Sequence, residues 1–225
     1  MDIVSLIMEY KWILEVCYAL IISSICMVIV TKTDKFFKLS MHQGIRYFRN
    51  AFFFYGVAFI GRYVFGLFSD MNWKSTLVIQ FLFEYFLITA GFFLLYSLIY
   101  KKIESSKEQH LTSLVNSKVI IFHIMSIILA TSDILFKSYF FMFLSQIIIF
   151  LCASIIAYNN FNKNKKKEFP KFYFLATIIG LVAWLLNYLA ASFFEWNHQI
   201  LINVGIMNIL FFLLFLYGVL KVTKK

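Results

Sequence analysis

Proline and charged residues are both scarce in this chain. Its 225 residues include one proline, Pro170, and 14% of them are charged, whereas a soluble domain has about 25% charged residues. By contrast, 62% of the residues are hydrophobic, and phenylalanine alone occurs 29 times. A soluble core cannot hide so much apolar surface, so the composition predicts an integral membrane protein.

The sequence also lacks the motifs of catalysis and of cofactor binding. It has no HExxH motif, P-loop, serine nucleophile elbow or paired catalytic carboxylates. No two histidines are spaced four residues apart on one predicted helix, so neither a bis-histidine haem nor a zinc site is indicated. Cys17, Cys26 and Cys152 lie within apolar stretches, where we expect them to pack as small apolar residues. We therefore expect no enzyme activity, no cofactor and no metal.

Seven stretches are apolar over the roughly 20 residues that a helix needs to cross a bilayer. They are 12–31, 46–68, 75–100, 118–136, 138–158, 171–194 and 199–220. The sequence thus predicts an all-α fold, a polytopic bundle of seven transmembrane helices that forms a single membrane domain, 1–225. The longest connection, 101–117, has room for one short helix and for no soluble domain.

The basic residues predict the orientation of this bundle. Of the 21 Lys and Arg residues, 17 lie in the segments 32–49, 101–118, 163–171 and 221–225, which share one side of the membrane in the predicted topology. Cytoplasmic loops carry such an excess of positive charge. We therefore expect a multi-pass protein of the cell membrane, with its N-terminus outside and its C-terminus in the cytoplasm.

Glycines recur every five residues in the second span, at Gly56, Gly61 and Gly66. Small residues let membrane helices approach each other closely, so we expect helix packing there, with a flexing point as the alternative. Since no span contains a proline, no proline kink is expected.

An internal repeat relates the two ends of the chain. A shift of 125 residues lays 36–74 on 161–199 without a gap and gives eight identities, which include Ala58 with Ala183 and Tyr63 with Tyr188. The shift predicts a first three-helix unit at 1–100, a connector helix within 101–136 and a second three-helix unit at 137–225. Because the connector crosses the membrane once, both units have the same orientation, as in a parallel repeat.

This layout of three, one and three helices resembles that of the SWEET and PQ-loop sugar carriers, which also have the N-terminus outside. The resemblance implies a carrier for a small solute. The sequence departs from those carriers in having no Pro-Gln dipeptide and no proline within a helix. The segment 44–56 (GIRYFRNAFFFYG) also resembles uncharacterised archaeal seven-helix membrane proteins, a likeness that implies no function.

Polar side chains inside the spans are candidates for a binding site, because such groups are costly at membrane depth. Arg62 and Glu84 fall at similar depth on adjacent spans, and we expect their charged groups to lie within salt-bridge reach, in a structural or a functional pair. The remaining candidates in the outer half of the bundle are Glu15, Trp184, Asn187, Asn203 and Asn208. If they converge, they line a pocket for a polar solute, whereas single Asn and Trp residues also serve as contacts between helices.

The function that we expect is a membrane carrier for a small polar solute. A seven-helix sensor or receptor that signals through a partner, or an accessory subunit, is the alternative. Expected partners are the lipid bilayer, the solute, anionic lipid headgroups on the basic face, and a second copy of the chain or another membrane protein. The net charge of +10 follows from the orientation signal, and without a recognition motif we expect no nucleic-acid binding.

The topology can be tested by labelling single cysteines in intact cells. A cysteine at Asn72 or Asn197 should react with an impermeant thiol reagent, and one at Ser106 should react only after the cells are opened, because the basic segments lie inside. The reverse pattern would overturn the orientation.

Overall fold

The structure, a computed structural model, describes residues 11–40, 43–68, 73–103, 117–163, 168–193 and 198–223, which are helical except for the turn at 137–139. Its elements are α2 (Lys11–Ser40), α3 (Gln43–Phe59), the π-helical turn η1 (Ile60–Val64), α4 (Phe65–Phe68), α5 (Trp73–Ile103), α6 (Ser117–Phe136), α7 (Phe140–Lys163), α8 (Glu168–Phe193) and α9 (His198–Thr223). Residues 104–116 of the predicted connector lie outside the described ranges.

Six helices are long and apolar enough to cross a membrane, namely α2, α5, α6, α7, α8 and α9. The chain is therefore a multi-pass helical membrane protein, as its composition predicts. The other predicted span, 46–68, is helical along its whole length, but the π-helical turn divides it and leaves α3 with 17 residues. Its passage through the membrane, and with it the count of seven spans, stays a prediction.

The π-helical turn η1 is the main feature of this region that the sequence does not predict. A Cβ atom added to Gly56 would lie 3.3 Å from Cβ of Cys26, whereas one added to Gly61 or Gly66 would meet nothing within 4 Å. Close helix packing thus accounts for Gly56 alone, while Gly61 belongs to the irregular turn. Such π-turns occur frequently at functional sites, and this one carries Arg62.

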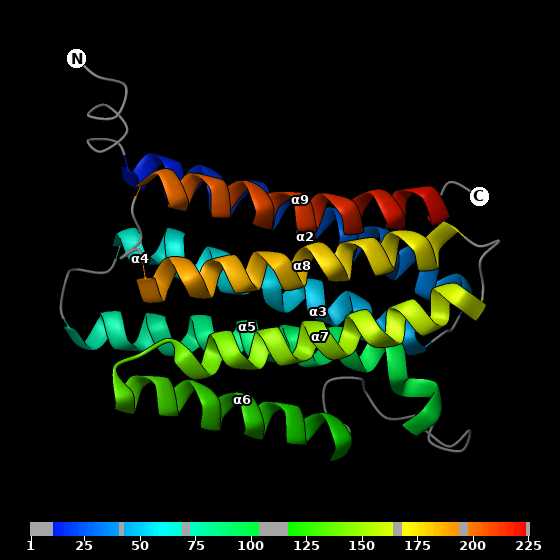
Figure 1. Cartoon of the computed structure of the whole chain (residues 1–225), viewed down its shortest axis with the longest axis horizontal. Coiled ribbons are helices and arrows are strands. Elements are labelled where there is room, and N and C mark those ends of the chain that lie inside the picture. Colours follow the sequence, from blue (N-terminus) through cyan, green and yellow to red (C-terminus); the bar gives the residue numbers. More distant parts are fainter. Residues whose placement is uncertain are drawn as a thin grey trace.

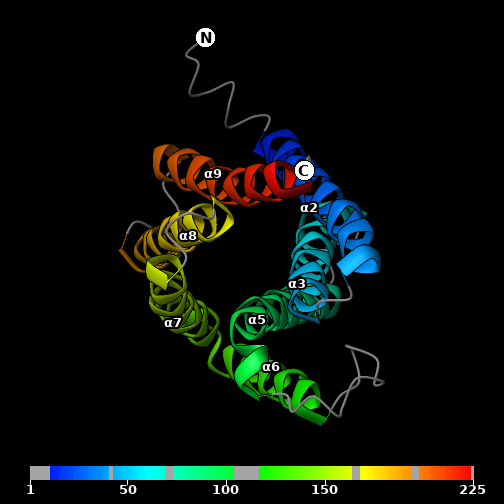
Figure 2. The same ribbon diagram turned by 90° about the vertical axis from the view of Figure 1, so that its right-hand side faces the viewer.

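Six helices pack into a closed ring in the order α2, α3, α5, α7, α8 and α9, with α9 returning to α2. The view along the helices shows this ring and shows α6 outside it (Figure 2). α6 packs on the outer side of α5 and α7. The side view shows that the helices of the ring run roughly parallel to a common axis (Figure 1). Any central site must therefore be built by the six helices of the ring.

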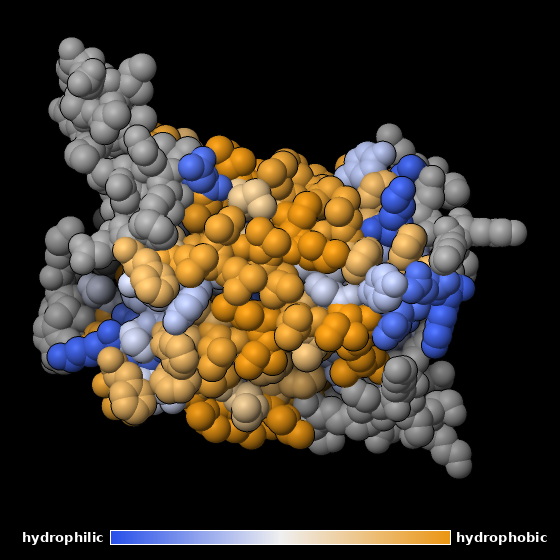
Figure 3. Space-filling view, viewed as in Figure 1, coloured by the Kyte–Doolittle hydropathy of each residue, from blue (hydrophilic) through white to orange (hydrophobic). Residues whose placement is uncertain are grey.

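The face of the molecule drawn in Figure 3 is apolar over its middle and carries polar residues toward both ends. α6 contributes much of this surface because it lies outside the ring, and Ile121 and Ile128 are 57% and 53% exposed. In water this exposure would be unfavourable, whereas in a bilayer the same side chains contact lipid. The apolar band thus agrees with a membrane-embedded bundle.

Aromatic side chains fill the middle of the ring and form what we call the aromatic barrier. Its members come from α3 and α9 and are all buried: Phe48, Phe52, Tyr55, Phe211, Phe212 and Phe215. The Phe52 ring lies 5.1 Å from that of Phe215 and 6.1 Å from that of Phe212, centroid to centroid. α3 and α9 are not neighbours in the ring, so these contacts cross its interior.

Gly180 of α8 makes the tight packing beside the barrier possible. A Cβ atom there would come within 2.6 Å of the Phe150 ring and 2.8 Å of the Phe211 ring. Gly180→Ala should therefore destabilise the protein, because overpacking costs about 1–3 kcal/mol and outweighs a helix-propensity gain of up to ~1 kcal/mol. Thermal melts in detergent measure the effect.

Gly205→Ala in α9 is the matched control. Its added Cβ would lie 3.8 Å from the Tyr18 ring, an ordinary contact distance. We expect no loss of stability from this variant, and equal melting temperatures for the two variants would show that the barrier tolerates a shift of its rings.

Candidate functional site

A cavity of about 440 Å³ opens inside the ring, toward the end where α2 begins, and we call it the Arg62 cavity. All six helices of the ring contribute to its wall, if η1 and α4 are counted together with α3. Of the residues predicted from the sequence, five line it: Glu15, Arg62, Trp184, Asn187 and Asn208. Residues that are distant in sequence therefore converge on one site, and the volume is typical of sites for small ligands.

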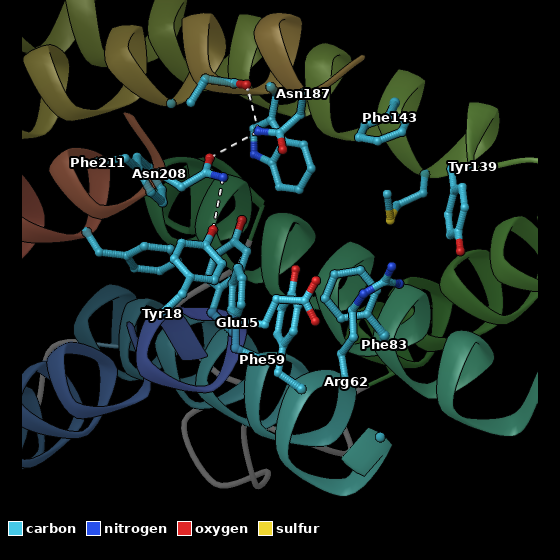
Figure 4. Close-up of a pocket in the computed structure, with 18 residues that line it drawn as sticks. Glu15, Tyr18, Phe59, Arg62, Phe83, Tyr139, Phe143, Asn187, Asn208 and Phe211 are labelled. Carbon is cyan, nitrogen blue, oxygen red and sulfur yellow. Dashed lines mark hydrogen bonds between the residues drawn. The ribbon is translucent and has the colours of Figure 1, made fainter. Parts of the chain in front are cut away.

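Arg62 extends from η1 into this cavity, where its side chain lies between aromatic rings (Figure 4). The guanidinium carbon is 4.6 Å from the ring centroid of Phe83, 5.6 Å from that of Tyr139 and 5.8 Å from that of Tyr63. Cation–π contacts of this kind stabilise a charge without neutralising it. The hydroxyl groups of Tyr63 and Tyr139 also interact with the guanidinium.

Asparagine side chains form a hydrogen-bonded chain across the opposite wall. Asn187 Nδ2 donates to Ala183 O at 2.7 Å and to Asn208 Oδ1 at 3.1 Å, and Asn208 Nδ2 donates to Tyr18 Oη at 3.0 Å (Figure 4). The chain links α8, α9 and α2. It therefore holds helices together and presents amide groups to the cavity at the same time.

Glu84 lies outside the lining of the cavity and is completely buried. Its Oε1 accepts a hydrogen bond from Gln80 Nε2 at 2.8 Å, and its carboxyl group interacts with that of Asp133 in α6. Among the described residues, no carboxylate oxygen lies within 4.0 Å of an Arg62 nitrogen. The expected ion pair between Arg62 and Glu84 is thus not formed in this structure. Asn203 is exposed on α9, away from the cavity.

Asp133 is a buried acid that the sequence analysis missed. Its Oδ1 accepts from Phe141 N at 2.9 Å and from Ser138 Oγ at 3.0 Å, and its Oδ2 accepts from Met142 N at 2.7 Å. These backbone groups belong to the first turn of α7, whose N–H groups have no partner within the helix. Asp133 therefore caps α7 from the preceding helix.

The hairpin between α6 and α7 places this cap. Lys137 has a positive φ of 49°, Lys137 N donates to Ile134 O, and Ser138 N donates to Asp133 O. This is the Schellman arrangement that ends many helices, usually with glycine at the left-handed position. The absence of glycine there hid the turn from sequence analysis. The hairpin also brings Tyr139 to the Arg62 cavity.

Tyrosine hydroxyl groups are the other feature of the site that the sequence analysis overlooked. Tyr18, Tyr55, Tyr63 and Tyr139 all line the cavity. A search of the spans for charged and amide groups alone passes over them, because tyrosine is common in apolar sequence. Their recurrence at the depth of Arg62 is the signal that could have indicated them.

A second cavity, of about 520 Å³, lies toward the opposite end of the ring, and we call it the Tyr173 cavity. All six ring helices line it, and its wall is mostly apolar. Tyr173 Oη shares a hydrogen bond with Ser97 Oγ at 3.2 Å. Tyr55 and Phe212 of the aromatic barrier line the Arg62 cavity, while Phe48 lines the Tyr173 cavity. The barrier therefore separates the two cavities.

Comparison of the chain with protein-family models, with curated proteins and with solved structures gives no match. The resemblance to SWEET and PQ-loop carriers stays a prediction from the layout of the sequence.

The cap on α7 can be tested by substitution. Asp133→Ala should destabilise the protein, since loss of a capping side chain costs about 0.5–2 kcal/mol, while Asp133→Asn should cost less because it keeps an acceptor oxygen. Thermal melts in detergent measure both variants. Ser132→Ala is the control, because that hydroxyl bonds only within its own helix, to Ile128 O. A loss from Ser132→Ala equal to that from Asp133→Ala would contradict the role of the cap.

Proposed function

We propose that the chain is a membrane carrier for a small polar solute, which binds in the Arg62 cavity. The observation that carries the proposal is the pair of cavities, one toward each end of the helix ring, with the aromatic barrier between them. A carrier exposes its binding site first to one side of the membrane and then to the other. It therefore needs a barrier between the site and the closed side, and this barrier must be able to open. Tyr18 and Thr33 mark the two cavities on α2, about 22 Å apart at the helical rise.

The barrier lies where the two predicted three-helix units meet. Phe48, Phe52 and Tyr55 belong to the first unit, and Phe211, Phe212 and Phe215 belong to the second. Polar contacts also join the units, from Asn208 to Tyr18 at 3.0 Å and from Tyr55 Oη to Gln146 Oε1 at 3.4 Å. A rocking of one unit against the other would open the barrier by breaking few bonds, since ring contacts are weak individually.

The order of contacts around the ring supports this division. Within each unit the middle helix touches both others, as α3 touches α2 and α5, and α8 touches α7 and α9. The units meet at two seams, α5 with α7 and α9 with α2. If the two units changed places, equivalent helices would still touch in the same order around the ring. A two-fold axis that runs along the central axis of the helix ring would generate this pattern.

A sensor would also need a ligand site, so the Arg62 cavity alone does not separate the two functions. A sensor does not need a second cavity on the far side of the aromatic barrier. The Tyr173 cavity therefore favours the carrier over a sensor or an accessory subunit.

Transport can be tested in proteoliposomes with a panel of radiolabelled sugars, amino acids and small organic acids. Ala183→Phe should abolish the saturable flux, because the added ring projects from the wall of the Arg62 cavity. Val182→Phe should retain it, since the neighbouring residue is 41% exposed on the outer face. Melting temperatures of both variants show that each is folded.

The proposal fails if no solute of the panel shows saturable flux through the wild-type protein, a result that would point to the sensor or the subunit. Equal flux through Ala183→Phe and Val182→Phe would instead remove the Arg62 cavity from the path.

A further inference from the structure

Among the described residues, Arg62 supplies the only cationic side chain in the lining of its cavity. Rings and tyrosine hydroxyl groups surround the guanidinium, and no carboxylate oxygen of the described residues lies within 4.0 Å of its nitrogens. A half-buried cation that contacts only rings and neutral hydroxyl groups among the described residues is costly inside a membrane protein and marks a functional site. A carboxylate that pairs directly with the guanidinium is thus expected to enter the cavity as part of a solute.

Glu84, the partner predicted for Arg62, has other contacts. Its Oε1 accepts from Gln80, and its carboxyl group meets that of Asp133. Asp133 binds two backbone N–H groups and a hydroxyl group, which hold it in place at the start of α7. Glu84 therefore lies beside Asp133 of α6, and it forms no ion pair with the guanidinium, which faces the cavity.

We propose that the Arg62 cavity binds a small organic monoanion with a flat apolar body, whose carboxylate pairs with the Arg62 guanidinium. The planar guanidinium matches a carboxylate with two parallel hydrogen bonds. Aromatic faces occupy much of the remaining wall, including Phe59, Phe143 and Trp184, and offer contact to a flat body.

The charge on the solute is limited by Glu15. This residue lines the cavity from α2, and Tyr63 interacts both with it and with Arg62. A second negative charge on the solute would face the carboxylate of Glu15, and the described lining of the cavity holds no cation besides Arg62. A single carboxylate is thus favoured over a phosphate ester or a dicarboxylate.

The amide groups of the opposite wall complete the site. Asn187 and Asn208 use their N–H groups on each other, on Ala183 O and on Tyr18 Oη. The amide chain thus brings no positive charge to the cavity, which leaves Arg62 as the group that selects for an anion.

This inference rests on the cavity of the proposed function, but its test does not require transport. Equilibrium binding of radiolabelled benzoate to the purified protein in detergent is measured by scintillation proximity, with benzamide and benzamidine as unlabelled competitors. The three probes share one ring and differ in charge. We expect benzoate to bind about tenfold or more tightly than benzamide, because hydrogen bonds between charged groups are the stronger ones, and we expect benzamidine to bind least.

Substitutions assign the preference to Arg62. Arg62→Gln should lower the affinity for benzoate to the affinity for benzamide, which is measured with labelled benzamide. Arg62→Lys should retain part of the preference for benzoate. Lys163→Gln is the control, because it removes an exposed cation at the end of α7, outside the lining of the Arg62 cavity. Unchanged binding of benzamide by Arg62→Gln shows that the site is still folded.

Three results would overturn the inference: no saturable binding of benzoate, equal affinities for benzoate and benzamide, or a preference that survives Arg62→Gln. The outcome for transport is separate. Flux of a neutral solute with no preference for anions would keep the carrier and remove this inference, whereas anion binding without flux of any solute would keep the site and remove the carrier.

Discussion

The packing of Phe52 against Phe212 and Phe215 joins α3 to α9 across a ring in which these two helices are not neighbours. Aromatic side chains pack edge to face and exclude water from the space that they fill. Without them the six helices would surround one continuous passage. With them the interior is divided into two cavities of similar volume, one toward each end of the helix ring.

The helices themselves follow from the sequence. In a bilayer a backbone polar group has no water to bond, so each long apolar stretch has to form a helix that satisfies its own N–H and C=O groups. Depth along the membrane is also readable, because it is counted from the charged ends of each span at 1.5 Å per residue. That count placed Glu15, Arg62, Trp184, Asn187 and Asn208 in the outer half of the bundle, and in the structure they line the Arg62 cavity together.

Direction around the helix is what the sequence leaves open. Glu84 has the depth of Arg62 but faces α6, and Asn203 faces outward, because the ring order of the helices decides which side is inside. A span that is apolar all round carries no periodic signal for its inner face. The capping role of Asp133 was not predicted for another reason. It depends on a turn in which Lys137 takes a left-handed backbone conformation, and sequence rules do not expect lysine at such a position.

The two units of the proposed carrier contribute different chemistry to one cavity, and this difference bears on the mechanism. The predicted repeat aligns Arg62 of the first unit with Asn187 of the second, so a cation faces an amide across the axis. A bound anion would pair with Arg62 while its apolar body contacts Trp184 and Phe143 of the second unit. Such a solute makes contacts with both units that neither can make alone, and it binds most tightly when they close on it. A ligand shifts a conformational equilibrium only through such a difference in affinity between states. In the proposed carrier, binding to Arg62 and closure of the Arg62 cavity would therefore be two aspects of one equilibrium.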